Sequence, residues 1–232
     1  MMTVEPHSSL LKYVPEKGLV LDAGCGFFTY TKFLKKYAKG IEIVCVDIAN
    51  LDVKESRKNN FVLSSVQNLP FDDSSFDFIL CLSLVQLISN DRKAIEEFYR
   101  VLKKPGKLLL TVPTKLSVFR LLRELEIICQ VYKYPEFNVK HYHYYNKSDI
   151  RSLVEEKFEI IDLYGYGYNC VPRLITFLAS FFKLGAKPHR KREIDANLSK
   201  INIHYMRFSK LLEGLLRKFS DFSYHYIVVL GK

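Results

Sequence analysis

The chain has 232 residues, of which 48% are hydrophobic, so it can bury a full core and does not have a disordered composition. Its longest apolar run, residues 174–182, is far shorter than the roughly 20 residues that a membrane-spanning helix needs. The formal net charge of +10 is concentrated late in the chain, where residues 165–232 hold 12 Lys and Arg against 4 Asp and Glu.

Apolar runs alternate with amphipathic segments along the first 167 residues. The patterns predict strands at residues 18–24, 41–49, 61–66, 76–84, 106–113 and 158–167, and helices at 30–38, 91–103, 114–132 and 147–157. Near-continuous apolar strands that alternate with helices indicate a mostly parallel sheet covered on both faces. The sequence therefore predicts an α/β fold with a doubly wound, Rossmann-like sheet.

The end of the chain adds one more predicted strand, residues 223–232. Residues 168–222 precede it, and 55 residues are too many for a plain connection. We expect this segment to be a mainly helical lid insert within a single domain that spans residues 1–232.

The five cysteines show no CxxC pair and no spacing typical of metal ligands. Most of them lie in apolar surroundings. The pattern favours buried free thiols in a reducing cytoplasm, and it predicts no metal site.

The stretch "LVLDAGCGFF", residues 19–28, combines a strand, a glycine turn and the start of a helix. Gly24 and Gly26 lack a Cβ, which allows a tight turn and the close approach of a ligand to the backbone. Asp22 places a carboxylate at the end of the strand, and Thr29 is a predicted N-cap. Phe28 stands where such loops often place a third glycine. Its ring either packs beneath the helix or narrows the ligand site.

Asp47 ends the second predicted strand, 25 residues after Asp22. An acidic residue at about this distance from the glycine turn suits the two hydroxyls of a ribose. The structural alternative is a helix cap or a solvent-facing strand end, and spacing together with position favours the ribose.

Four segments, "VLDAGCG", "VCVDIA", "NLPFDDSSFDFIL" and "RVLKKPGKLLLTVP", stand in order between residues 15 and 167. With them the sequence resembles the class I S-adenosylmethionine-dependent methyltransferases, in the ubiquinone/menaquinone C-methyltransferase-like type 11 branch. The resemblance implies S-adenosyl-L-methionine as cofactor. It also implies a seven-stranded sheet of order 3-2-1-4-5-7-6 with an antiparallel last strand.

The resemblance further implies a role for each matching position. Asp22 and the glycine turn would line the methionine end of the cofactor, Asp47 would hold the ribose, and Ile48 would pack on the adenine. The implied cofactor site consists of Asp22, Ala23, Gly24, Cys25, Gly26, Asp47, Ile48, Ser65, Val66, Gln67, Leu82 and Ser83.

Three positions depart from the family pattern. The first is Phe28. The second is Ser65, which replaces an acidic residue that often binds the adenine amino group. Gln67 or the backbone can substitute for that contact. Leu87 replaces a His that is common after strand four, which removes an acid or base.

Residues 140–149, "KHYHYYNKSD", contain the clearest candidates for chemistry. His141 or His143 would act as general base or orient an acceptor hydroxyl. The alternative, slightly favoured for each residue singly, is a structural histidine that bonds backbone. Aromatic side chains would line an acceptor pocket, at Tyr144, Tyr145, Tyr166 and Tyr168.

These features predict a methyltransferase that acts on a small-molecule or lipid-like acceptor. A non-catalytic cofactor-binding regulator and an RNA methyltransferase are the alternatives. Residues 171–192 join an apolar helix to Lys187, Arg190, Lys191 and Arg192. This pattern favours a lid or a peripheral contact with an anionic membrane surface, and makes nucleic acid the less favoured partner.

Overall fold

A computed structural model of the protein describes residues 10–50, 52–115, 141–166 and 225–232. The described residues before 114, together with 141–164 and 225–232, belong to one compact unit. A second unit comprises residues 114–139 and 165–224, most of which lie outside the described residues. The predicted helix at 114–132, the lid insert at 168–222 and the basic segment at 171–192 therefore stay predictions.

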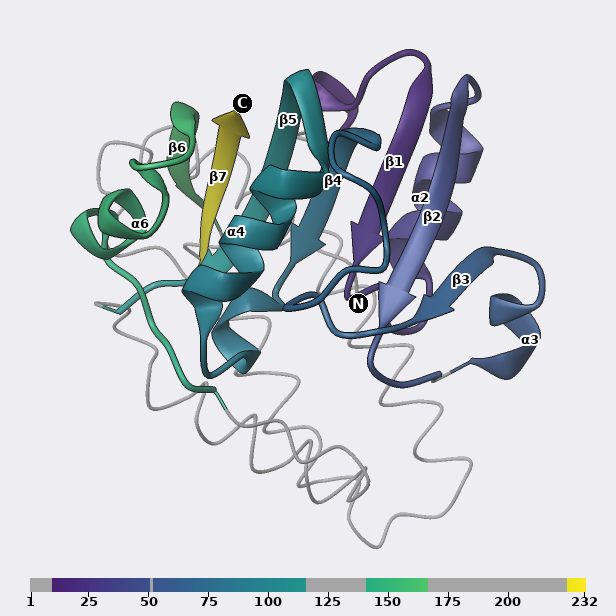
Figure 1. Ribbon diagram of the computed structural model, residues 1–232, viewed down its shortest axis with the longest axis horizontal. Helices are drawn as coiled ribbons and strands as arrows, with labels where there is room; N and C mark the ends of the chain where they lie inside the picture. The colour runs from purple at the N-terminus through teal and green to yellow at the C-terminus, as the bar shows by residue number, and fades with distance from the viewer. Residues whose placement is uncertain (1–9, 51, 116–140, 167–224) are drawn as a thin grey trace, which may run out of the picture. The chain divides into compact units, whose positions relative to one another are not determined.

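The described part of the chain forms a seven-stranded sheet of order β3-β2-β1-β4-β5-β7-β6 (Figure 1). The strands are β1 (Gly18–Ala23), β2 (Ile41–Asp47), β3 (Asn60–Leu63), β4 (Phe76–Leu82), β5 (Leu102–Pro113), β6 (Glu159–Tyr166) and β7 (His225–Gly231). β7 runs antiparallel to β5, whereas β1 to β5 pair in parallel. The predicted strand order and the antiparallel last strand are confirmed.

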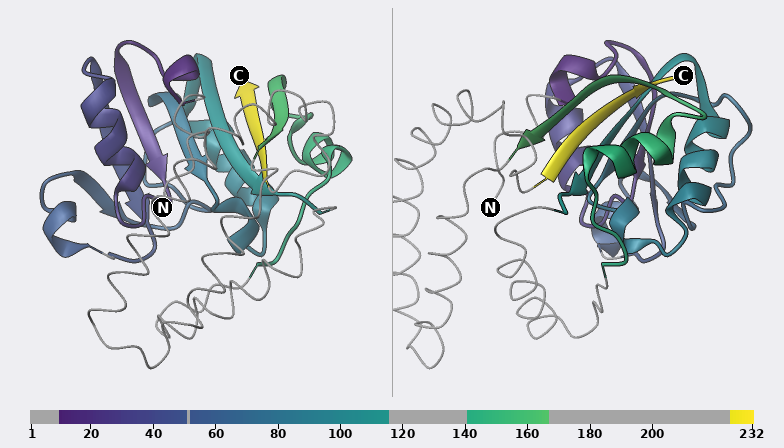
Figure 2. Two further views of the ribbon diagram at one scale, coloured as in Figure 1. Left: turned by 180° about the vertical axis from the view of Figure 1, so that it is seen from behind. Right: turned by 90° about the vertical axis from the view of Figure 1, so that its left-hand side faces the viewer.

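Helices cover both faces of this sheet. They are α2 (Thr29–Tyr37), α3 (Val53–Ser56), α4 (Asp91–Val101) and α6 (Lys147–Val154), with a 3₁₀ turn η1 (Val85–Leu87). α4 and α6 lie on one face and α2 on the other (Figures 1 and 2). Because parallel β1, β2 and β4 all end at the same edge, the loops that follow them meet there.

The core explains why the apolar runs become strands. β4 buries five of its seven residues, and β7 buries Tyr226 to Leu230 without interruption. Strands covered on both faces require such continuous apolar runs. On α4, Ala94, Ile95, Phe98 and Val101 are the buried residues, as helical spacing of apolar residues requires.

The largest boundary difference from the prediction is at the start of β5. This strand begins at Leu102, where it pairs with Phe76, rather than at residue 106. A Pro-Gly pair is typical of turns, yet the strand continues through Pro105 and Gly106. α3 and η1 were not predicted, because elements of three or four residues are too short to show a periodicity.

The structure shows which of the two predicted positions the Phe28 ring takes. Phe28 is the N-cap residue of α2 in the left-handed region, with φ 59°, so Thr29 is the first helical residue and its predicted cap role is wrong. The Phe28 side chain is fully buried and packs edge-on against Phe61 of β3, with ring centroids 5.7 Å apart. The ring therefore packs beneath the helix, and the packing compensates for a conformation that costs an ordinary residue about 1–2 kcal/mol.

We predict that Phe28→Ala lowers the free energy of unfolding by about 3–5 kcal/mol, because it leaves a cavity between α2 and β3. Phe28→Gly loses the same ring but relieves the left-handed strain, so it should be about 1 kcal/mol more stable than Phe28→Ala. Urea unfolding measures both values.

The exposed neighbour Phe27 provides the matched control, with 54% of its surface exposed. Phe27→Ala should change the free energy of unfolding by no more than about 0.5 kcal/mol. Equal effects of Phe27→Ala and Phe28→Ala would contradict the packing role of Phe28.

Candidate cofactor and acceptor site

The turn after β1 is fastened to the end of β2 by three backbone amides. The N–H groups of Gly24 and Cys25 both donate to the carbonyl oxygen of Val46, at 2.7 and 3.1 Å. The third backbone amide, that of Gly26, donates to Oδ2 of Asp47 at 3.0 Å. The glycine turn and the acidic strand end, which the sequence predicted to act together, are thus in direct contact.

The two glycines of the turn are needed for different reasons. Both have positive φ, 76° at Gly24 and 50° at Gly26. A Cβ on Gly24 would lie 2.8 Å from Cδ2 of Leu84, whereas a Cβ on Gly26 would meet no atom within 4 Å. Gly24 therefore makes room for the loop after β4, and Gly26 leaves open space in which a ligand can approach the backbone.

Asp47 lies where a ribose-binding carboxylate is expected. Its Oδ2 accepts from Gly26, and its Oδ1 accepts from the N–H of Ala49 at 3.1 Å. Each carboxylate oxygen keeps a second lone pair, so both can still accept from hydroxyl groups. The adjacent Ile48 has 75% of its surface exposed. An exposed isoleucine beside this carboxylate offers an apolar face to a flat ring.

The turn at residues 64–68 lies beside the end of β2, since Ser64 N–H donates to the carbonyl of Asp47 at 3.0 Å. Ser65 Oγ accepts from the N–H of Gln67 at 3.2 Å. The Gln67 amide reaches the carbonyl of Asn90 at 3.1 Å, and the Val66 side chain is buried in the core. One of the two donors on the Gln67 side-chain nitrogen is therefore used within the protein. The oxygen of the same amide can accept from a donor such as an adenine amino group.

The loop after β4 brings a strained polar residue to the same edge of the sheet. Ser83 follows Leu82, is exposed, and has φ 53°. Its N–H donates to Thr111 Oγ1 of β5 at 2.9 Å. Non-glycine residues in the left-handed region concentrate at functional sites, and the resemblance to the methyltransferases implies that Ser83 lies near the sulfonium of the cofactor.

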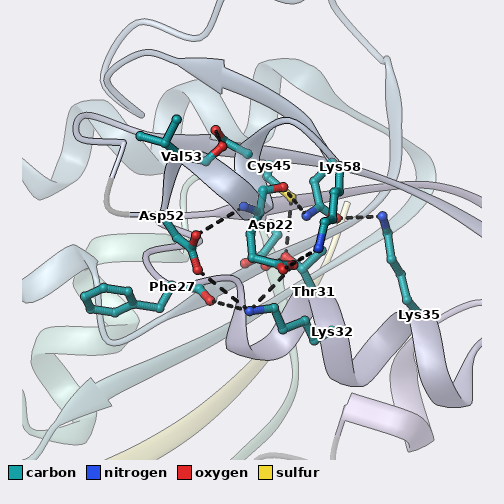
Figure 3. A network of polar contacts seen from close by, with 12 residues as sticks. Asp22, Phe27, Thr31, Lys32, Lys35, Cys45, Asp52, Val53 and Lys58 are labelled. Atoms are coloured by element: carbon teal, nitrogen blue, oxygen red, sulfur yellow. Dashed lines mark hydrogen bonds and ion pairs between the residues drawn. The ribbon is translucent and has the colours of Figure 1, made fainter.

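Asp22 is more deeply buried than a ligand-facing carboxylate usually is. Only 4% of its surface is exposed, and its Oδ2 accepts from the hydroxyl of Thr31 on α2 at 2.5 Å. The pKa of Asp22 is raised to about 6, mainly by burial and also by the nearby Asp47 charge, while the two hydrogen bonds from Thr31 act to lower it. Figure 3 shows Asp22 and Thr31 next to each other, with this contact drawn as a dashed line.

The histidine-rich segment is held against η1 by backbone bonds. The N–H groups of Tyr142 and His143 approach the carbonyl of Gln86, at 2.8 and 3.4 Å. His143 Nε2 lies 3.2 Å from the carbonyl of Ser89. Because a carbonyl only accepts, this contact requires the proton on Nε2 and leaves Nδ1 as the remaining lone pair of a neutral ring. His141 stacks at a tilt on Tyr144, with ring centroids 5.6 Å apart.

The four tyrosines proposed for the acceptor differ in position. Tyr145 is 3% exposed within the hydrophobic core, and its hydroxyl donates to Asp91 Oδ2 at 2.9 Å. Burial and the Asp91 charge raise its pKa. Tyr144 is partly exposed, Tyr166 is buried as the last residue of β6, and Tyr168 lies outside the described residues.

Three residues of this region were not singled out from the sequence. Thr31 binds Asp22, Leu84 packs over Gly24, and the backbone of Gln86 holds the histidine segment. Only Thr31 had a usable signal, because it lies three residues before the buried Leu34 on the inward face of α2. The described cysteines, Cys25, Cys45 and Cys81, are buried and form no disulfide.

The arrangement defines a class of protein. A doubly wound sheet with a glycine turn after β1 and an acid at the end of β2 is the structure of a nucleotide-cofactor-binding α/β protein, whose ligand lies at the carboxyl edge of the strands. Within the described residues, no helix is both long and apolar enough to cross a membrane.

Comparison with known proteins finds a family that part of the chain resembles. Residues 21–110 match the family described as methyltransferase domain, in its type 11 group. The demethylmenaquinone methyltransferase of Thermotoga maritima is 34% identical over 105 residues, which cover 44% of this chain and 45% of that protein. The chain spans about half the length of the curated relatives it matches first.

Solved structures agree on the fold. A putative sarcosine dimethylglycine methyltransferase from Galdieria sulphuraria covers 98% of this chain and 84% of its own, with a TM-score of 0.60 at 17% identity. The [4+2]-cyclase SpnF covers 98% of this chain and 79% of its own, with a TM-score of 0.64 at 16% identity. Over residues 21–110 the chain is similar to the type 11 family of S-adenosylmethionine-dependent methyltransferases.

The described residues fit the cofactor of that family, S-adenosyl-L-methionine. The open space at Gly26, the fixed carboxylate of Asp47 and the exposed Ile48 lie together at the end of β2. They offer respectively a close backbone approach, hydrogen-bond acceptors for a ribose and an apolar face for an adenine.

The position of Tyr145 yields a prediction about its role. Tyr145→Phe should lower the free energy of unfolding by about 1.5–3 kcal/mol, because it removes a hydrogen bond to a charged group at the start of α4. Urea unfolding measures this loss. In a double-mutant cycle with Asp91→Ala, the two losses should be less than additive. Additive losses would show that the two side chains do not interact.

Proposed function

We propose that this protein is an S-adenosylmethionine-dependent methyltransferase that transfers a methyl group to a small-molecule or lipid-like acceptor. The observation that carries the proposal is the contact of the glycine turn with Asp47, because it joins two cofactor-binding elements of the family in one site. The acceptor class is supported by the relative named demethylmenaquinone methyltransferase, which by its name acts on demethylmenaquinone.

When bound, the cofactor supplies a methyl group already activated on a sulfonium. The protein then has to position the acceptor in line with this group and keep water away. We assign the ribose to Asp47, the adenine to Ile48 and the turn at 65–67, and the methionine end to Asp22, Gly24, Gly26 and Ser83.

A general base is needed only for an acceptor that must lose a proton. His143 is the better candidate of the two histidines, because its contact with Ser89 fixes one tautomer and leaves Nδ1 as the proton-accepting atom. The same contact with the Ser89 carbonyl is also what a purely structural His143 would make. A membrane contact through residues 171–192 remains a prediction, because that segment lies outside the described residues.

We predict that Asp47→Ala weakens binding of S-adenosylhomocysteine by about 1–3 kcal/mol, or roughly 5- to 150-fold, through loss of hydrogen bonds to buried hydroxyls. Calorimetric titration measures the dissociation constant. Glu42→Ala is the matched control, because Glu42 is an exposed acid on the same strand, five residues from Asp47 and away from the turn. An unchanged constant in Asp47→Ala would refute the ribose assignment.

Methyl transfer itself is tested with tritiated S-adenosylmethionine. The protein is incubated separately with the lipid extract, the polar small-molecule extract and the tRNA of a cell. We expect label in one of the first two fractions, and we expect Asp47→Ala to lose transfer at subsaturating cofactor while Glu42→Ala retains it.

The other outcomes have defined meanings. Label only in tRNA would support the RNA methyltransferase alternative, most clearly if transfer falls steeply with salt. Cofactor binding without any transfer would support the non-catalytic regulator. The fold likeness to a [4+2]-cyclase makes this control necessary, because fold alone does not establish the reaction.

A further inference from the structure

Thr31 is fully buried on the inward face of α2 and is directed at the carboxylate beneath the glycine turn. Its hydroxyl donates to Asp22 Oδ2 at 2.5 Å, and its backbone N–H also bonds the Asp22 carboxylate. The same hydroxyl lies 3.3 Å from Cys45 Sγ on β2. Figure 3 shows the three side chains as one cluster that joins β1, α2 and β2.

The start of α2 explains why a carboxylate belongs there. A helix begins with N–H groups that have no partner inside the helix, and a side chain at the N-cap usually accepts from one of them. Phe28 occupies the N-cap and makes no side-chain cap bond. Asp22 accepts instead from Thr31, the third helical residue, so a residue of the neighbouring strand caps this helix. The positive end of the helix dipole favours the ionised form of Asp22.

The other titratable groups around Asp22 oppose that charge or do not compensate for it. Asp47 approaches from β2, and its charge raises the pKa of Asp22. Cys25 of the turn, Cys81 of β4 and Tyr30 of α2 each have a pKa that the Asp22 charge helps to raise. On β2, a hydrogen bond from Cys25 lowers the pKa of Cys45, and the charge of Lys35 acts in the same direction. Thr31 is therefore the main group holding the ionised carboxylate.

We propose that Thr31 is a positioning residue for cofactor binding, which keeps the buried Asp22 carboxylate ionised and fixed for the cationic amino group at the methionine end of the cofactor. This role rests on the proposed function, because it needs Asp22 to face that end. Thr31 itself touches no ligand and acts through Asp22.

The test compares Thr31→Val, which has the same shape without the hydroxyl, with Thr31→Ser, which restores it. Thr29→Val is the matched control, because it makes the same change at the exposed first residue of the helix. The dissociation constant of S-adenosylhomocysteine is measured by calorimetry between pH 5 and 8. Only ionised Asp22 pairs with the ammonium group, so wild-type affinity should fall as the pH drops through about 6.

In Thr31→Val the carboxylate loses a hydrogen bond to its charged form, so its pKa rises. The pH at which affinity falls should move upward by about one unit, which weakens binding at pH 6 by about fivefold. Thr31→Ser and Thr29→Val should both keep the wild-type profile. Equal weakening of Thr31→Val at every pH would indicate a purely structural role and overturn the proposal.

A measurement without ligand separates this inference from the proposed function. The pKa of Asp22 is higher in the folded protein than its ordinary value of 3.8, so its contribution to stability is present at low pH and is lost as the pH rises to about 6. In the ligand-free protein, Thr31→Val should extend this decline to higher pH, and Asp22→Asn should abolish it.

An unshifted decline in Thr31→Val would overturn the role of Thr31. A shifted decline in a protein that binds no cofactor would instead refute the proposed function, and the cofactor role of Thr31 with it. If Thr31→Val does not fold, Thr31→Ala repeats both measurements, because it also removes the hydroxyl and keeps the backbone N–H.

Discussion

The structure depends on how the chain leaves β1. The sheet order changes direction between β1 and β4, and at this point the helices that follow the strands diverge to opposite faces. The turn after β1 is fixed there because the amides of Gly24, Cys25 and Gly26 all bind the end of β2. Two glycines in the left-handed region make that geometry accessible, and the position of Asp47 follows from it.

A third glycine is not required for this turn. Phe28 adopts the same positive φ, and its buried ring against Phe61 stabilises α2 from below. Two interactions offset the absence of a glycine and of a side-chain cap at this position. The Phe28 ring packs in the core on one side of the helix start, and the Asp22 carboxylate accepts hydrogen bonds from Thr31 on the other. The departure of Phe28 from the family pattern therefore changes how the helix is anchored and leaves the ligand side of the turn open at Gly26.

Features of the fold that leave a pattern in the sequence could be predicted, whereas contacts with partners from distant parts of the chain could not. Continuous apolar runs and their spacing sufficed for a doubly wound, mostly parallel sheet, because burial on both faces and right-handed crossovers leave few arrangements. The order of its strands was expected only from the resemblance to the methyltransferases. The meeting of Asp22, the glycine turn and Asp47 followed from their positions at the ends of the first two strands. The cap of α2 was mispredicted at Thr29, since a partner that comes from another strand has no local signal. Tyr145 was predicted to line an acceptor pocket, but it is buried in the core and its hydroxyl donates to Asp91, a partner 54 residues away that no local pattern reveals.

The loss of the common histidine at Leu87 has a similar explanation. The histidine segment is held by backbone bonds to Gln86 and by the contact of His143 with Ser89, so its position does not depend on the side chain at residue 87. What the replacement removes is a titratable group near the carboxyl edge of β4. Under the proposed methyl transfer, an acceptor atom that is already nucleophilic would need no base, and the neutral leaving group of a sulfonium would need no acid. For such an acceptor, holding its atom in line with the methyl group would matter more than deprotonating it.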